Sequence, residues 1–428
     1  MKRIKINGVQ RGDILLTARP GKISKAIRIA TSGIVSHAMI CVQHGSVIDS
    51  TSDGVQARNL QREFFKDNEQ ALHFRLKNPP DRQVLEKVIE YARAEIGARY
   101  SIAEAVRSVV ATSRPESRRQ FCSRLIARAY KRAGIELVMD TDYCSPEDLR
   151  QSQLLEELPV EFETISIEEV SRLSDHANPI QATHDAQNAV LNAARSVDPG
   201  VENFDDLYNF LVNHPEADPL IATVLKSSGY LDIWKIEVTK HPWRYSHELI
   251  DKFTAPHEPI RDYCIGTLKE AYSGGIRFAI NLVQLQAAQR QHPRDSFCLE
   301  ITLYETLIRY DQCRREVAYE WLKRHYPDQL EEHMEEIEPH TPFWWYIVER
   351  VEPNLAALSR HVVTSEGKAD VCTSCGDQPA SPYRLVNGAE TMPGVPSLRL
   401  CGDCVEIRLG MGNTLMPFLS RPPESNGE

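Results

Sequence analysis

The sequence predicts a multidomain α+β protein, and three observations lead to this fold class. The chain has 428 residues, and domains of about 100–200 residues imply about two to four of them. Short apolar runs separated by turn residues prevail up to about residue 76, whereas helical spacing prevails over residues 203–352. The end of the chain is rich in glycine, proline and clustered cysteine.

The first predicted domain spans residues 1–160 and mixes strands with helices. Apolar runs bounded by turn residues predict strands at residues 13–17, 37–42, 46–49 and 72–76. Two helices are then expected, at residues 84–96 and 122–133, and each is followed by a glycine. We expect this domain to close near residue 160, after the Ser-Pro-Glu-Asp-Leu segment at 145–149.

Three further segments are expected after this domain. Residues 161–202 are polar and mixed, which predicts a linker carrying short helices. Residues 203–355 predict an all-α domain, with helices at 204–212, 220–225, 245–253, 260–271, 276–288, 301–310 and 317–325. A small cysteine-rich module is expected at residues 365–415, and a disordered tail at 418–428.

The formal net charge of −10 conceals a strong asymmetry along the chain. Residues 1–135 hold 25 Lys and Arg against 12 Asp and Glu, a net charge of +13, so the remainder carries −23. Such polarity predicts domains with different roles or with mutually complementary faces. The hydrophobic fraction of 42% is ordinary for a globular protein and excludes wholesale disorder.

The expected location of the protein determines how its ten cysteines are interpreted. No apolar run approaches the ~20 residues of a membrane span, and no apolar segment follows the basic N-terminus as in a secretory signal. These features predict a soluble, cytoplasmic protein. The ten cysteines are therefore expected to be metal ligands, a nucleophile or buried thiols rather than disulfides.

Cys122, His37 and Asp49 form the candidate catalytic set. Cys122 is expected in the first turn of an amphipathic helix, where the helix dipole and the neighbouring arginines favour the thiolate. His37 begins a predicted strand, and a hairpin turn at 43–45 brings Asp49 within one to three positions of its cross-strand partner. A carboxylate that orients an imidazole beside a thiol is the arrangement of a cysteine hydrolase.

These residues lie in motifs that resemble the NlpC-type papain-fold cysteine peptidases. Gly-Asp-Ile-Leu at 12–15 and Ser-His-Ala-Met-Ile at 36–40 resemble that family's strands, and its third polar residue follows the His by 12 positions, as Asp49 follows His37. The Cys segment at 121–126 follows these strands instead of preceding them, which is the order of the circularly permuted, YiiX-like branch. Gly97 to Tyr100, Gly134-Ile135 and the segment 145–149 resemble further elements of that branch.

The resemblance implies a permuted papain-like domain over residues 8–155 that hydrolyses an amide or peptide bond through an acyl-enzyme. Tyr100 and Ser123 are the expected substrate contacts, although Tyr100 could equally pack in the core. Cys144 imitates the local pattern, but Pro146 and no comparable helix follow it. The same triad suits a thioesterase or an acyltransferase, and a non-catalytic lipid- or peptide-binding scaffold is the alternative of a different class.

The C-terminal cysteines form two Cys-x-x-Cys pairs, Cys372 with Cys375 and Cys401 with Cys404. Two residues between thiols let both sulfurs face one ion, and four thiolates close a tetrahedral shell, as in structural zinc sites. We expect a Zn²⁺-binding, zinc-ribbon or treble-clef-like module with a small hairpin at 383–386 and 398–400. An iron–sulfur cluster or redox dithiols remain the alternatives.

The expected partners follow from these features. We expect the substrate to be a peptide or an acyl conjugate that belongs to a protein. We also expect a protein partner to bind the helical domain or the zinc module. No dense basic patch with interleaved aromatics surrounds the cysteine pairs, so no nucleic acid is expected. Walker, GxGxxG and GxSxG motifs do not occur, which removes support for nucleotide binding and serine hydrolysis.

Overall fold

The chain divides into two compact units, Met1–His333 and Met334–Glu428, and each is described by itself. The computed structural model describes residues 1–18, 21–67, 69, 71–100, 119–175, 179–330, 337–365, 370–386, 395 and 397–417. The tail expected at 418–428 lies outside these residues. The first unit contains the expected papain-like domain, the expected linker and most of the expected helical domain, so these segments share one compact body.

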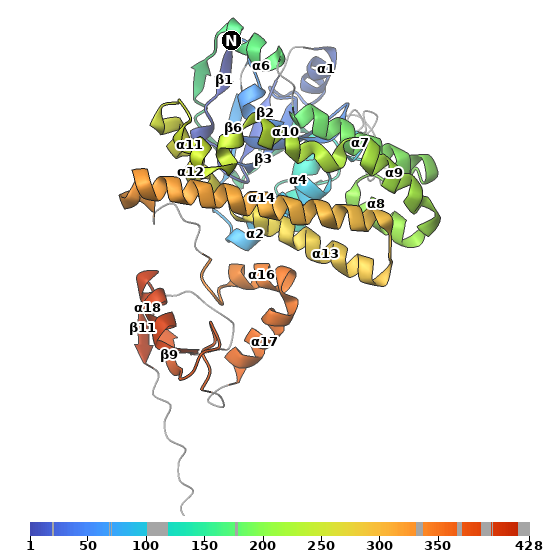
Figure 1. Cartoon of the computed structure of the whole chain (residues 1–428). Coiled ribbons are helices and arrows are strands. Elements are labelled where there is room, and N and C mark those ends of the chain that lie inside the picture. Colours follow the sequence, from blue (N-terminus) through green and yellow to red (C-terminus); the bar gives the residue numbers. More distant parts are fainter. Residues whose placement is uncertain are drawn as a thin grey trace, which may run out of the picture. The chain divides into compact units, whose positions relative to one another are not determined.

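A six-stranded antiparallel sheet, in the order β5-β4-β3-β2-β6-β7, organises the N-terminal part (Figure 1). Its strands are β2 (Ile14–Thr17), β3 (His37–Gln43), β4 (Ser46–Thr51), β5 (Gly54–Asn59), β6 (Ala71–Leu76) and β7 (Leu155–Leu158). The four inner strands were all predicted. The two edge strands were not, because edge strands carry polar and charged side chains and lack a continuous apolar pattern.

Helices α2 (Arg82–Ala94) and α4 (Cys122–Arg132) pack together on one face of this sheet. Their buried side chains, including Val88, Leu125 and Ile126, share an apolar core with Ile14 and Ile40 of the sheet. The opposite face packs a second apolar cluster near the small pair of strands β1 (Lys2–Ile4) and β8 (Phe162–Thr164). The described residues of this part also include three shorter helices, namely α1 (Lys22–Ala30), α5 (Pro146–Arg150) and α6 (Ile167–Asp175).

The expected linker differs from the observed structure. It contains α7 (Pro179–Val197), a helix of 19 residues whose Val190, Leu191 and Ala194 are buried. These side chains pack with those of α8 (Phe204–Asn213) and α9 (Asp218–Ser227) in one apolar core. Most polar residues of α7 lie on its exposed face. The apolar residues on the buried face of α7 pack against α8 and α9 and thereby hold α7 in the first unit.

The remaining helices of the first unit are α10 (Ile233–Lys240), α11 (His247–Asp251), α12 (His257–Lys269), α13 (Arg277–Gln291) and α14 (Asp295–His325). The helices α13 and α14 lie side by side (Figure 1). The two helices expected at 301–310 and 317–325 are one continuous helix of 31 residues, since the intervening Asp-Gln-Cys-Arg-Arg-Glu contains no helix breaker. Over the part of the chain that the structure describes, no helix has the length and apolarity to cross a membrane.

Over its described residues, the second unit combines three helices and a small sheet with the two cysteine pairs. The helices α16 (Pro342–Val351) and α17 (Pro353–Thr364) precede the first pair, and α16 falls within the range expected for the helical domain. Strands β9 (Ser381–Leu385), β10 (Leu398–Leu400) and β11 (Leu415–Pro417) form an antiparallel sheet in the order β10-β9-β11. Helix α18 (Gly402–Gly410) begins directly after Cys401, so Cys404 lies in its first turn.

Candidate active site and cysteine cluster

Cys122 is the first residue of α4, as predicted, and lies at the N-terminal end of this amphipathic helix. The preceding Phe121 is extended, and no side chain among the described residues caps the helix. The backbone N–H groups of the first turn have no intrahelical acceptors, so they are available at the end of the helix where Cys122 lies. The residue itself is only 6% exposed.

His37 and Asp49 come from the neighbouring strands β3 and β4. Met39 pairs with Asp49, and His37 lies two residues before Met39 in β3, so His37 and Asp49 are on the same face of the sheet. His37 Nε2 and Asp49 Oδ2 are 2.9 Å apart. The structure therefore brings together the two residues whose contact depended on the hairpin register.

Cys122 also affects the charge of His37. Its side chain is among the groups that raise the pKa of His37, while the ring atom Nε2 of His37 faces Asp49. Burial opposes a positive charge on His37, but the interactions with Asp49 and Cys122 outweigh it and raise the pKa of His37 to about 10. These interactions favour the protonated form of the His37 imidazole.

Arg58 is a further site residue, which the sequence analysis missed. Its Nε donates to both carboxylate oxygens of Asp49, at 2.8 and 2.9 Å. Burial raises the pKa of Asp49, but His37 and Arg58 together hold it below the usual value. The pairing of β4 with β5 sets Asp49 opposite Gln56, two residues before Arg58. Predicting β5 from the tight turn at 52–53 would have revealed this neighbour.

Tyr100 and Ser123, the expected substrate contacts, occupy different environments. Burial raises the pKa of Tyr100, and the electrostatic effect of Cys122 adds to this rise. Ser123 is completely buried, and its hydroxyl donates to the Cys144 carbonyl at 2.7 Å. This hydrogen bond holds the Ser123 side chain inside the fold, and its role as a substrate contact stays a prediction.

The arginines beside Cys122 have defined partners of their own. Arg124 is 1% exposed, and its guanidinium donates to the carbonyl oxygens of Asp142 and Arg119, at 2.6 and 2.8 Å. It also lies over the Phe121 ring, 4.4 Å from the centroid. Through these contacts Arg124 joins the start of α4 to the segments that contain Asp142 and Arg119. Its positive charge belongs to these contacts, rather than to an open anion site.

The other thiols of the first unit are distinct from Cys122. Cys144 is 2% exposed, and burial together with Asp148 raises the pKa of its thiol. Cys41 and Cys264 are also buried, and burial raises the pKa of each to about 12. Cys298 is exposed. Among the described thiols of this unit, Cys122 is the one that contributes to the raised pKa of His37.

The two C-terminal cysteine pairs converge in the second unit. The sulfur atoms of Cys372, Cys375, Cys401 and Cys404 all lie within 4.8 Å of one another. The Sγ atoms of Cys375 and Cys401 are 3.5 Å apart. Burial opposes ionisation of Cys372, but backbone N–H groups, first that of Cys401, lower its pKa to about 7. The four thiols can therefore hold one metal ion together.

Comparisons with known proteins identify the N-terminal part. Residues 8–162 match the family model of permuted papain-like amidase enzymes, YaeF/YiiX, of the C92 family. Solved structures that resemble the chain include the metalloprotein yiiX from Escherichia coli O157:H7, with 17% sequence identity and a TM-score of 0.30. That match covers 36% of this chain and 97% of the other. No curated protein matches the chain.

The order of the elements agrees with this family model. The strands that bear His37 and Asp49 precede the helix that bears Cys122, which is the permuted order. The match ends at residue 162, close to the strand β8. Residues 8–162 are therefore consistent with a permuted papain-like domain similar to the YaeF/YiiX amidases, and about two thirds of the chain lie outside the matched region.

Proposed function

We propose that the papain-like domain is a cysteine hydrolase that cleaves an amide or peptide bond. Cys122 acts as the nucleophile, His37 transfers protons, and Asp49 orients His37. The observation that carries this proposal is the His37–Asp49 hydrogen bond, together with the effect of Cys122, the first residue of α4, on the pKa of the same His37. The amidase family of the domain supports the same class of reaction.

Each side chain has a defined part in the proposed reaction. The Cys122 thiolate attacks the carbonyl carbon, a C–S bond forms, and the carbonyl π electrons move to oxygen. Backbone N–H groups of the first turn of α4 stabilise that oxyanion. Collapse breaks the C–N bond, and the leaving nitrogen takes the proton of His37.

Water then completes the cycle. His37 Nδ1, now neutral, accepts a proton from a water molecule whose oxygen attacks the acyl carbon. The C–S bond breaks, which releases the carboxylic acid and restores the thiolate. An amine in place of water would give acyl transfer, and a thioester in place of the amide would be cleaved by the same steps.

The proposal is tested by selective labelling. A peptidyl vinyl sulfone should modify Cys122 faster than the exposed Cys298, although Cys122 is nearly buried, because the His37 pair supplies a thiolate. Cys122→Ala should abolish this labelling, and Cys144→Ala is the matched control that should retain it. Labelling that follows exposure, with Cys298 modified before Cys122 in folded protein, would reject the enzyme and leave the binding scaffold.

We further propose that the C-terminal cluster holds a structural zinc ion. Zn–S bonds of about 2.3 Å in a tetrahedron set the sulfurs about 3.8 Å apart, in keeping with the separations of these four thiols. Four thiolates leave no position for water, so zinc there would join the 372–375 turn to the start of α18 and stabilise the fold.

Elemental analysis of the purified chain tests the zinc site. One equivalent of zinc is expected, and Cys372→Ser should lower the zinc content, whereas Cys298→Ser, the matched control, should leave it unchanged. Iron in place of zinc, or no metal with unaltered folding of Cys372→Ser, would reject the assignment.

A further inference from the structure

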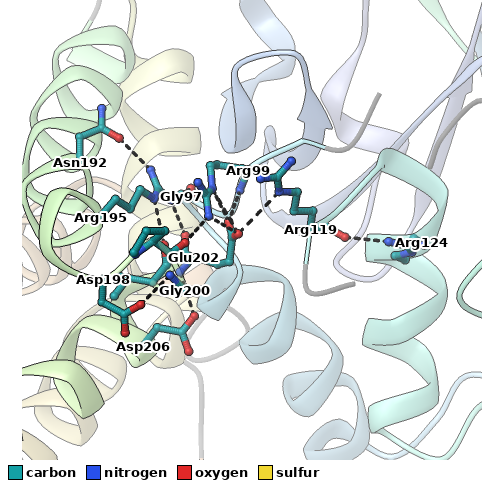
Figure 2. A network of polar contacts seen from close by, with 12 residues as sticks. Gly97, Arg99, Arg119, Arg124, Asn192, Arg195, Asp198, Gly200, Glu202 and Asp206 are labelled. Atoms are coloured by element: carbon teal, nitrogen blue, oxygen red, sulfur yellow. Dashed lines mark hydrogen bonds and ion pairs between the residues drawn. The ribbon is translucent and has the colours of Figure 1, made fainter. Parts of the chain in front are cut away.

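Glu202 reaches from the helical part of the first unit into the papain-like domain. It lies between α7 and α8, and its side chain is 7% exposed. Its carboxylate accepts the backbone N–H of Arg99 at 3.1 Å and the guanidinium Nη2 of Arg99 at 2.6 Å. Arg119 Nε lies 3.9 Å from the same carboxylate (Figure 2). One buried acid thus joins two arginines of the papain-like domain.

The two arginines flank the candidate active site. Arg99 directly precedes Tyr100, and Arg119 lies three positions before Cys122. The two segments are themselves joined, because the Gln120 N–H donates to the Arg99 carbonyl at 3.1 Å and Tyr100 pairs with Gln120. A displacement of Arg99 is therefore passed to the residues that lead into α4.

Arg195 of α7 reinforces the same attachment. Its Nη2 donates to the carbonyl oxygens of Gly97 and Glu202, at 2.8 and 2.7 Å (Figure 2). Gly97 has φ of +94°, and a Cβ there would lie 2.2 Å from Leu191 Cδ1. The turn at 97–100 is thus held by both the backbone and the side chains of the helical part.

The region next to the contact between Glu202 and Arg99 is lined mainly by polar side chains. A cavity of about 180 Å³ lies there, and its lining residues are Tyr91, Glu95, Gln120, Arg128, Glu202 and Asn203. Gln120 is 1% exposed, and its Oε1 has no hydrogen-bond partner among the described residues. The Gln120 side chain donates to Glu95 at 2.9 Å, and its backbone N–H donates to the Arg99 carbonyl, so the backbone of this segment is tied to the turn that Glu202 holds.

We infer that Glu202 is a positioning residue for the proposed hydrolase: through Arg99 and Arg119 it holds the segments that carry Tyr100 and Cys122 in register. This inference rests on the proposed function. The helical part is then a structural component of the active site, rather than a separate domain that delivers substrates. Glu202 acts through the arginines and does not itself contact the reacting atoms.

The direction in which Glu202→Gln changes the alkylation rate of Cys122 distinguishes a positioning role of Glu202 from an electrostatic one. Glu202→Gln removes a negative charge beside two arginines, which makes the surroundings of Cys122 more positive. Added positive charge favours the thiolate, so a purely electrostatic role predicts faster alkylation of Cys122. Loss of positioning predicts slower alkylation, because a small misplacement of a reacting group costs up to about 100-fold in rate.

The experiment uses the full-length chain and two measurements. Iodoacetamide should alkylate Cys122 about tenfold more slowly in Glu202→Gln than in the wild type, with partial recovery in Glu202→Asp. Arg99→Gln should give a similar loss, and the double variant should lose about tenfold rather than about 100-fold, since both changes break one interaction. Hydrogen exchange of amides 97–100 and 119–125 should accelerate in Glu202→Gln.

Tyr272→Phe is the matched control, because Tyr272 contacts Glu90 of α2 across the same pair of parts, at a different place. It should leave both measurements unchanged. A wild type whose Cys122 does not react selectively would reject the hydrolase, and hydrogen exchange would then decide the role of Glu202 alone. Equal exchange and equal or faster alkylation in Glu202→Gln would overturn the inference, even if the wild type reacts as proposed.

Discussion

The carboxylate of Asp49 controls the charge of His37, and Asp49→Asn tests this control. The pKa of His37 rises from 6.5 to about 10 in the structure, which corresponds to about 5 kcal/mol between its two protonation states. Asp49 lies 2.9 Å from His37 Nε2. A negative charge at this distance raises the pKa of a neighbouring group by about 1 to 3. Asp49→Asn should therefore lower the pKa of His37 to between about 7 and about 9, a change of about 1.4 to 4 kcal/mol.

Two alkylating reagents measure this change without knowledge of the substrate. The imidazolium of His37 attracts anionic iodoacetate toward Cys122 but has little effect on neutral iodoacetamide. The ratio of the two alkylation rates is therefore high while His37 is protonated and falls as the pH rises through its pKa. We expect the fall near pH 10 in the wild type and at a pH lower by about 1 to 3 in Asp49→Asn.

Asp53→Asn is the matched control for this prediction. Asp53 is exposed and lies in the turn after β4, so its replacement removes the same charge from the same hairpin without breaking the bond to His37. The fall in the rate ratio should stay near the wild-type pH. An unchanged profile in Asp49→Asn, or an equal displacement in Asp53→Asn, would refute the assignment of Asp49 as the group that orients His37.

Three further predictions concern Arg58, Gly97 and the cysteine cluster. Arg58→Gln leaves the buried carboxylate of Asp49 without its guanidinium partner and should cost about 1–3 kcal/mol of unfolding free energy in urea at pH 7; an unchanged value would contradict the pairing. Gly97→Ala should cost a similar amount, about 1–3 kcal/mol, because of its positive φ and the nearby Leu191, and Leu191→Ala in the same chain should make the combined cost less than additive. Removal of metal by a chelator should accelerate hydrogen exchange in β9–β11 and leave the central sheet of the first unit unaffected; equal protection before and after chelation would show that no ion stabilises this sheet.

Local pattern was sufficient to predict much of the papain-like domain. The inner strands are apolar runs between turns, and the two helices have clear apolar periodicity, so both kinds of element are visible in short windows of sequence. The contact of His37 with Asp49 followed from one short hairpin, since the period of a strand places alternate residues on the same face. The cysteine pairs were equally accessible, because two residues between thiols already define how both can face one ion.

The edge strands and the helical part illustrate why other features were missed. The β5 and β7 strands carry polar residues on their exposed side, so neither has a simple apolar pattern. The expected linker proved to contain α7, whose few buried residues find their partners only in α8 and α9. Similarly, Ser123 is directly next to the candidate nucleophile in sequence, but the helical twist of α4 directs its hydroxyl to the Cys144 carbonyl.

The sequence by itself determined which residues have the chemistry: a cysteine at a helix start, a histidine and a carboxylate on one hairpin, and four thiols in two pairs. Only the tertiary structure decided how they are supported. Arg58 lies on a strand that the pattern did not reveal, and Glu202 is separated from Arg99 by 103 positions. Chemical identity and local periodicity are properties of short segments, whereas ion pairs between distant segments form only when the whole chain packs.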